Sequence, residues 1–225
     1  MTIIVNRKVK LYAIMGKENN ELGGEKRMST EGKARIILAA KQVISRNSIA
    51  GATMRAIAEE AGLSTGAIYH YYNSKEEILY EVMNESLSET LRISNESKKR
   101  EQSCEELIEE IYTHILKRFD KTEENRIQFY LAQEAMLGNT ELKEKFKSKY
   151  QEWVSRTEEL MQNMYGKVPT RYNKALATLL IGAIDGVAMQ LLLSANPASV
   201  EDITEVYHQL LKSGIPKFLE HLGTI

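Results

Sequence analysis

Apolar residues recur every three or four positions along almost the whole chain, which is the spacing of one face of an α-helix. The apolar-polar alternation of a half-buried strand is scarce. The three prolines, Pro169, Pro197 and Pro216, all lie late in the chain and therefore permit long helices before them. The pattern predicts an all-α fold of about nine helices.

The first helix is expected over 33–46 and is followed by a polar loop over 47–52. Two short helices are expected after Thr53 and Ser64, because both residue types cap helix N-termini well. Gly62 lies between these helices and suits the end of the first one. This arrangement predicts two short helices joined by a tight turn.

Capping-box patterns at Ser74 and Ser103 are expected to open two longer helices. Further helices are expected over 124–137, 139–165, 170–195, 199–213 and 216–222. The order of elements predicts a flexible N-terminal extension (1–28), a helix-turn-helix domain (29–76) and a larger helical body (77–225). The N-terminal extension lacks the layout of a signal peptide. An unstructured extension or a mis-set start codon is favoured over an extra arm that contacts phosphates.

Segment 175–195 is almost wholly apolar and about as long as a membrane span. Asp185 lies at its middle, where an acidic residue is unfavourable in a bilayer. A helix that is buried on nearly all sides in a helical bundle explains the segment better than a membrane span does.

The formal net charge is −1, so any nucleic-acid binding must come from a local patch rather than from the whole chain. The single cysteine, Cys104, excludes an intramolecular disulfide framework and a cysteine-rich zinc site. One free thiol suits a reducing compartment, and we therefore expect a cytoplasmic protein.

Residues 53–75 read TMRAIAEEAGLSTGAIYHYYNSK, and four features of this stretch predict a helix-turn-helix. Ala58 is small enough for the second helix to approach closely. Gly62 tolerates the left-handed backbone of a tight turn. Ser64 can cap the second helix. The apolar residues expected between the two helices are Ile57, Leu63 and Ile68.

The outer face of the second helix is expected to carry Thr65, Gly66 and Tyr69, with Ala67 and His70 beside it. Small residues let a helix approach base edges, and hydroxyl and aromatic groups can contact phosphates or thymine methyls. Arg55 and Lys75 are placed to reach DNA as well. The alternative is that the Tyr-His-Tyr-Tyr run forms a packed aromatic corner with no role in binding.

Over 33–79, and most clearly over 53–79, the sequence resembles the signature of the tetracycline-repressor (TetR) family. The resemblance implies that the helix over 64–71 is a recognition helix. It also implies a homodimer that presents two such helices to successive major grooves, and hence a near-palindromic operator. The DNA-contacting residues implied in this way are Thr53, Arg55, Ser64, Thr65, Gly66, Ala67, Tyr69, His70, Tyr71 and Lys75.

The resemblance further implies that the last two long helices pack against the partner's copies. Both carry apolar stripes, and an apolar surface nearly all round suits a helix buried on its own core side and on a partner side. The candidate interface residues are Leu179, Gly182, Ala183, Gly186, Tyr207, Leu210 and Leu211.

The C-terminal body carries no pattern of an enzyme, a metal site or a bound cofactor. Its histidines are scattered, and His208 with Glu205 is better explained as a solvated pair. A nucleophile elbow and a glycine-rich phosphate loop are both lacking. A helical enzyme and a helical protein adaptor are therefore weaker alternatives to a ligand-released repressor.

A pocket for a small, largely apolar or aromatic effector is expected inside the body, because methionine and aromatic side chains can accept varied ligands. Asp185 could pair with a cationic ligand or make a structural hydrogen bond at the dimer interface. The candidate lining residues are Tyr112, Phe119, Phe129, Gln133, Met136, Tyr150, Trp153, Met161, Asp185 and Met189.

Overall fold

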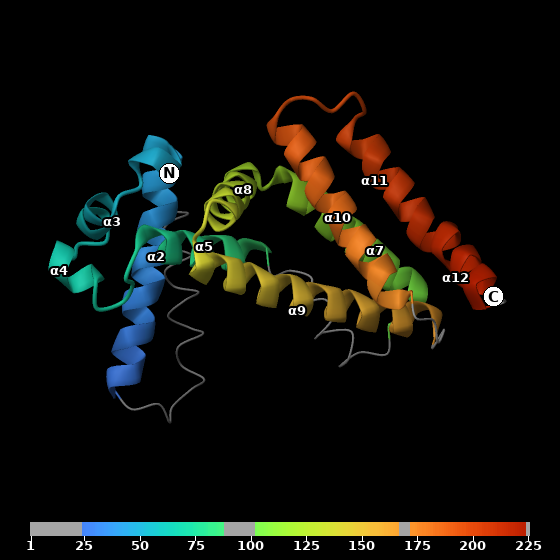
Figure 1. The fold of residues 1–225 in the computed structure, drawn as a ribbon, viewed down its shortest axis with the longest axis horizontal. Coiled ribbons are helices and arrows are strands. Elements are labelled where there is room, and N and C mark those ends of the chain that lie inside the picture. The colour runs from blue at the N-terminus through green and yellow to red at the C-terminus, as the bar shows by residue number, and fades with distance from the viewer. Residues whose placement is uncertain (1–23, 88–101, 167–171, 224–225) are drawn as a thin grey trace. The chain divides into compact units, whose positions relative to one another are not determined.

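The computed structural model describes residues 24–87, 102–166 and 172–223, and these residues form helices and connecting turns without any strand. The prediction of an all-α fold is confirmed. The chain divides into two compact units, Met1–Lys75 and Glu76–Ile225. The elements are labelled in Figure 1.

The N-terminal unit contains α2 (Gly24–Gly51), α3 (Met54–Glu60) and α4 (Thr65–Ile68). Helix α2 begins earlier than the expected residue 33, inside the segment predicted to be a flexible extension. Near its end, Ser48 has a left-handed φ of 61°, which breaks the helix within the predicted loop over 47–52.

Buried aliphatic residues of α2 and α3 form the interior of this unit, and both helices contribute residues with no exposed surface, including Ile36 and Ile57. An ion pair between Arg46 and Glu60, 2.6 Å apart, also joins these two helices. The apolar residues that recur every three or four positions in α2 form its buried face.

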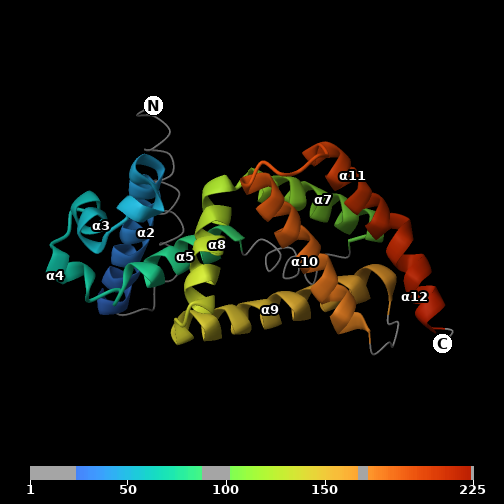
Figure 2. The same ribbon diagram turned by 45° about the horizontal axis from the view of Figure 1, so that its top comes forward.

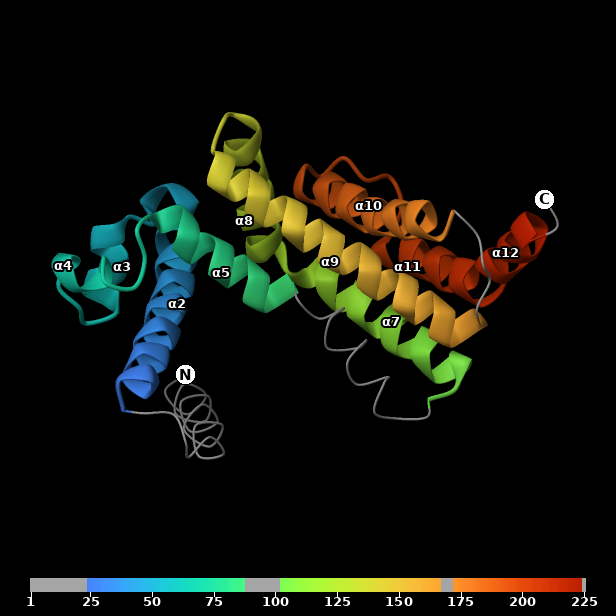
Figure 3. The ribbon, with the colours of Figure 1, turned by 60° about the horizontal axis from the view of Figure 1, so that its bottom comes forward.

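The C-terminal unit is a bundle of longer helices, and α9 runs beside both α7 and α10 (Figure 3). Helix α11 packs along α7, as the second view shows (Figure 2). Its helices are α5 (Lys75–Leu87), α7 (Cys104–Asp120), α8 (Thr122–Met136), α9 (Thr140–Tyr165), α10 (Asn173–Leu192), α11 (Val200–Gln209) and α12 (Ile215–Gly223).

Local capping interactions fix where several of these helices begin. Ser103 forms the predicted capping box with Glu106 at the start of α7. Asn139 caps α9 and Ser199 caps α11 through their side-chain oxygens. Gly166, with φ 77°, lies immediately after α9. These starting points follow from contacts within a few residues along the chain.

The expected break at 214–216 is wrong, because the helix continues through a π-helical turn over Leu210–Gly214 into α12. A proline in a regular α-helix removes a hydrogen bond and clashes with the carbonyl four residues earlier. The wider π turn precedes Pro216, which lies at the second position of α12, where the missing N–H is tolerated.

Helix α10 is apolar yet only partly buried within one chain, since Ala177 and Ala188 are its only buried residues. Leu179 on its outer side is 70% exposed. In the described parts of the chain, α10 is the one helix whose length and composition would allow it to cross a membrane. One copy of the chain therefore does not supply the burial that the apolar pattern predicted.

Candidate nucleic-acid interface and internal cavity

The turn between α3 and α4 is built by short-range hydrogen bonds. Thr53 Oγ1 accepts from the backbone N–H of Ala56 at 3.1 Å, and Ser64 Oγ accepts from that of Ala67 at 3.1 Å. Between the helices, Gly62 has a left-handed φ of 65°. These predicted caps and the predicted glycine turn are confirmed, and they aim the start of α4 away from α3.

The inner side of α4 is anchored by Ile68, which has no exposed surface and lies in the same unit as the fully buried Ile57 and Ala58. Tyr72 is also buried, with the Lys33 ammonium 5.4 Å from the centre of its ring. These contacts hold the helix by one side only.

The aromatic residues over 69–72 divide into a packed pair and an exposed pair. Tyr71 packs so closely on Gly32 that a Cβ there would come within 2.5 Å of the tyrosine ring. Tyr72 is buried, whereas Tyr69 is 52% exposed and His70 is exposed as well. The alternative of a packed aromatic corner therefore describes Tyr71 and Tyr72, and leaves Tyr69 and His70 on the surface.

The outer surface of α4, which we call the α4 face, consists of Ser64, Thr65, Gly66, Tyr69 and His70, and all five are exposed. A Cβ added at Gly66 would meet only Ser64 Oγ, 4.0 Å away. Packing within the chain thus gives no reason for a glycine at this position. The small side chain instead leaves room for something outside the chain to approach the backbone.

Two basic residues flank the α4 face. Arg55 on α3 is exposed, and its Nε donates to Glu59 at 2.9 Å. Lys75 begins α5 and is half-buried. Exposed ion pairs of this kind contribute little to stability, so Arg55 can exchange Glu59 for a phosphate at small cost.

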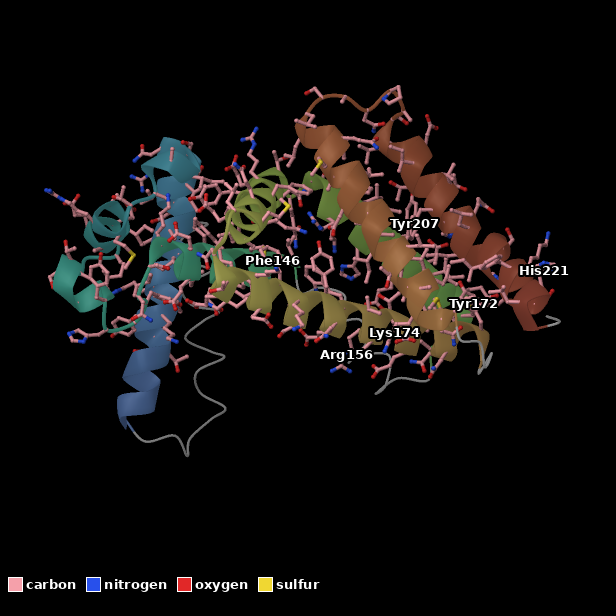
Figure 4. The ribbon with its side chains drawn as sticks, in the orientation of Figure 1. Phe146, Arg156, Tyr172, Lys174, Tyr207 and His221 are labelled. Atoms are coloured by element: carbon pink, nitrogen blue, oxygen red, sulfur yellow. The ribbon has the colours of Figure 1, made fainter. Side chains whose placement is uncertain are left out.

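In the C-terminal unit, helices α7, α9, α10 and α11 enclose a cavity of about 140 Å³. Most of its wall is aliphatic or methionine, with one aromatic ring on α9 and another on α11. Tyr207, labelled in Figure 4, lies between α10 and α11, and its hydroxyl donates to the Leu180 carbonyl at 3.3 Å. The aliphatic and aromatic lining includes Leu87, Ile111, Ile115, Trp153, Met161, Ile184 and Tyr207.

Asp185 lies on the cavity wall and is held by three side chains. Tyr150 donates to its Oδ2 at 2.6 Å, and Gln128 donates to its Oδ1 at 3.2 Å. The Arg118 guanidinium lies 3.4 Å from the same Oδ1 and donates to Gln128 Oε1 at 2.6 Å. The carboxylate is therefore part of a network within one chain.

The network shifts the pKa of two of its members, Arg118 and Tyr150. Burial lowers the pKa of Arg118, while the adjacent carboxylate of Asp185 opposes this shift. Burial, and then the negative charge of Asp185, raise the pKa of Tyr150, so that its hydroxyl stays protonated and donates.

Two buried donors on the cavity wall have no acceptor among the described residues: Nη1 of Arg118 and Nε1 of Trp153. Trp153 is only 6% exposed. Buried polar groups in folded proteins almost always have a partner, so this pair of donors requires an explanation.

Residues 36–82 match the family described as bacterial regulatory proteins of the tetR family. The region over 36–82 is therefore a regulatory DNA-binding segment of the tetR-family type. An uncharacterized HTH-type transcriptional regulator, YfiR, from Bacillus subtilis (strain 168) is 38% identical over 60 residues. That match covers 27% of this chain and 29% of the relative's length.

Solved structures resemble this chain well beyond the matched region. A transcriptional regulator from Saccharomonospora viridis in complex with choline has a TM-score of 0.63 and 19% identity, with 82% of this chain and 97% of that one covered. FadR from Thermus thermophilus in complex with lauroyl-CoA has a TM-score of 0.62 and 13% identity, with 81% and 94% covered. At such identities the likeness shows the fold alone.

Some of the predicted pocket residues do meet at the cavity. Trp153, Met161 and Asp185 line it, and Tyr150 is bonded to Asp185. Tyr112 instead packs its ring on His208, with the centroids 5.3 Å apart. The remaining candidates lie in the core or on the surface away from the lining: Phe119, Phe129, Gln133, Met136 and Met189.

The cavity also contains charged residues that sequence reasoning missed. Lys117, Arg118 and Lys121 line it from the end of α7. A usable pattern was present, because Ile111, Ile115 and Arg118 follow the spacing of one helix face. Among the described residues, no group of three His, Cys, Asp or Glu side chains could hold a metal ion.

The candidate dimer residues separate into two groups. Leu179, Gly182, Ala183, Gly186 and Leu210 are exposed. Leu211 is buried in the core and Tyr207 lines the cavity, so the expectation that these two lie on an outer surface is wrong. They lie four residues apart on the inner side of α11 and its π-helical continuation, whereas Val206 and Leu210 occupy the outer side.

His208 also differs from the expectation. Its Nε2 lies 2.9 Å from Glu109 on α7, whereas Glu205 accepts from Gln209. The histidine therefore joins two helices that lie far apart in the sequence.

Proposed function

We propose that this chain is a cytoplasmic DNA-binding regulator of transcription that binds a palindromic operator as a homodimer and releases it when a small molecule enters the cavity. The observation that carries the proposal is the α4 face. It is held from behind by Ile68, is exposed in front, and carries hydroxyl, aromatic and glycine residues without an acid.

The α4 face suits DNA better than it suits a protein partner. Its side chains can donate to phosphates and contact base edges, and Gly66 allows close approach of the backbone. A protein adaptor would be expected to carry an acidic or fully apolar face here, and the α4 face is neither.

Homodimerisation is supported by the outer surfaces of α10 and α11. We call the exposed apolar residues there the α10–α11 face: Leu179, Gly182, Ala183, Gly186, Met189, Leu193, Val206 and Leu210. Large apolar patches are rare on monomeric proteins, so the exposed apolar residues of both helices favour burial against a second copy. A twofold dimer would carry two α4 faces, and this symmetry requires a near-palindromic operator.

Release by a ligand is supported by helix α5. It begins at Lys75, close to the α4 face in sequence, and ends at Leu87, which lines the cavity. A ligand that binds one position of α5 better than another would shift the protein toward that position. The complexes of FadR with lauroyl-CoA and of the S. viridis regulator with choline support a ligand-holding role for this fold.

The first test is selection of genomic DNA fragments by the purified full-length protein, followed by sequencing and titration of the enriched sites. We expect an enriched near-palindrome bound by a dimer. Tyr69→Ala and Lys75→Ala should each weaken binding by about tenfold, because each removes one contact worth roughly 1–3 kcal/mol.

The matched control is Tyr172→Ala, which removes an exposed tyrosine from the C-terminal unit. It should leave the affinity for DNA unchanged. The proposal fails if no fragment is enriched, or if both variants at the α4 face bind the site as tightly as the unmodified protein.

A further inference from the structure

We propose that the cavity binds a small organic carboxylate. Arg118 and Trp153 would hold the carboxylate group of this ligand, and aliphatic side chains would surround its apolar part. This assignment deepens the ligand-sensing role proposed above and rests on it for its regulatory meaning. Three observations lead to it: unpaired donors, the balance of charge, and the size of the cavity.

The unpaired donors define what the ligand must carry. Nη1 of Arg118 and Nε1 of Trp153 are buried, belong to residues that line the cavity, and have no acceptor among the described residues. Leaving a buried donor unsatisfied is unfavourable, whereas an oxygen atom on a ligand would satisfy it. The cavity therefore selects a ligand with hydrogen-bond acceptors.

The charge balance distinguishes an anion from a cation. Lys117, Arg118 and Lys121 line the cavity, and Asp185 is the single acidic residue of the lining. Both oxygens of Asp185 already accept hydrogen bonds from side chains of this chain. A cationic ligand would have to displace these donors, whereas an anionic ligand adds a charge-assisted bond to Arg118.

The aromatic rings give a cation little further help. Tyr150 and Trp153 form an edge-to-face pair with centroids 5.1 Å apart. The Lys149 ammonium already lies 5.9 Å from the centre of the Trp153 ring. Lys149 is itself paired with Glu152 at 2.9 Å, so a cationic ligand on the same side of the ring would compete with an ammonium that is already held there.

The volume of the cavity limits the ligand to about the size of one aromatic ring with a small substituent. A cavity of about 140 Å³ is close to the engineered apolar cavities of roughly 150 Å³ that hold benzene. The walls contributed by Ile111, Ile115, Leu180 and Ile184 suit a short aliphatic chain or one aromatic ring. Benzoate and hexanoate represent the two forms.

The test is titration calorimetry of the full-length protein, without DNA, with benzoate and hexanoate. Benzamide and hexanamide serve as uncharged controls of the same shape, and phenyltrimethylammonium serves as the cation. We expect each carboxylate to bind at least about tenfold more tightly than its amide, because charge-assisted hydrogen bonds are the stronger ones. The cation should give no binding heat.

Variants of the network test the assigned residues. The double change Arg118→Met with Asp185→Asn removes both buried charges together, and it should abolish the preference for carboxylate over amide. Trp153→Phe keeps an aromatic ring but removes the N–H, and it should weaken carboxylate binding by roughly fivefold. Arg156→Met is the matched control, since Arg156 pairs with Glu159 and is not part of the lining.

The inference is overturned if the amides or the ammonium bind as tightly as the carboxylates, if neither carboxylate binds at millimolar concentration, or if the double variant keeps the preference. Thermal melting of each variant verifies that it is folded before it is titrated. If the carboxylates bind but leave the DNA complex intact, the proposed release fails and this inference stands. If the protein binds DNA but neither carboxylate binds, this inference fails and the proposed DNA binding stands.

Discussion

The α4 face and the α10–α11 face are both exposed, and both contain glycines that packing within the chain does not require. A Cβ at Gly182 or Gly186 would meet nothing within 4 Å, and one at Gly66 would meet only Ser64 Oγ at that limit. Glycine lowers the stability of a helix interior by about 0.5–1 kcal/mol relative to alanine. In both places we infer that a partner approaches the backbone.

The two faces differ in chemistry. The α4 face is hydroxylic and aromatic, whereas the α10–α11 face carries leucine, alanine, methionine and valine. The first can exchange hydrogen bonds with water as readily as with a polar partner. The second gains free energy only when apolar surface leaves water, which a second copy of the same face would provide.

The largest effect should come from salt concentration, which should weaken binding at the α4 face but not at the α10–α11 face. Raising the salt concentration from about 50 to 200 mM should weaken operator binding by roughly 10³-fold or more if each dimer neutralises several phosphates. The dimer itself should persist, because apolar burial is not weakened by screening. Fluorescence anisotropy and sedimentation equilibrium measure the two effects. A salt-insensitive DNA complex would contradict the proposed contacts.

A charge on the α10–α11 face should break the dimer. Ala183→Glu would bury a carboxylate against its own copy, and the dissociation constant should rise by at least about 100-fold. Sedimentation equilibrium measures the change, and affinity for the full palindrome should fall with it. Gln151→Glu, at an exposed position on α9, is the control. An unchanged dimer would show that the partner binds elsewhere.

The smallest effects should come from the glycines. Gly66→Ala should leave the unfolding free energy unchanged or raise it by up to about 1 kcal/mol, yet weaken DNA binding roughly fivefold. Gly182→Ala should instead raise the dimer dissociation constant by a similar factor. Chemical denaturation, anisotropy and sedimentation report the three quantities. If both variants change only DNA affinity, or both change only the dimer dissociation constant, the two faces do not bind different partners.

The helix-turn-helix could be predicted from the sequence because its geometry depends on near neighbours. Thr53 and Ser64 each cap a helix through an N–H three residues later. Gly62 needs only its own left-handed φ. What the pattern could not show is that Tyr71 packs on Gly32, almost forty positions earlier. Nothing in local spacing distinguishes Tyr71 from the exposed Tyr69.

The cavity could be predicted only in part. Methionine and aromatic content correctly suggested Trp153 and Met161, but the same criterion included Met136, which is 79% exposed. Arg118 and Asp185 are 67 positions apart, and their contact depends on how α7 and α10 pack. Residue type alone does not reveal such pairing.

The sequence by itself determined the helical class, the capped turn of the DNA-binding motif and the apolar character of α10, because all three depend on periodicity or on contacts within one turn. Tertiary structure decided which side of α11 faces inward, how the charge of Asp185 is neutralised, and that Arg118 and Trp153 retain unpaired donors. These outcomes required packing between distant helices, since a side chain's partners depend on which neighbouring helix its face meets.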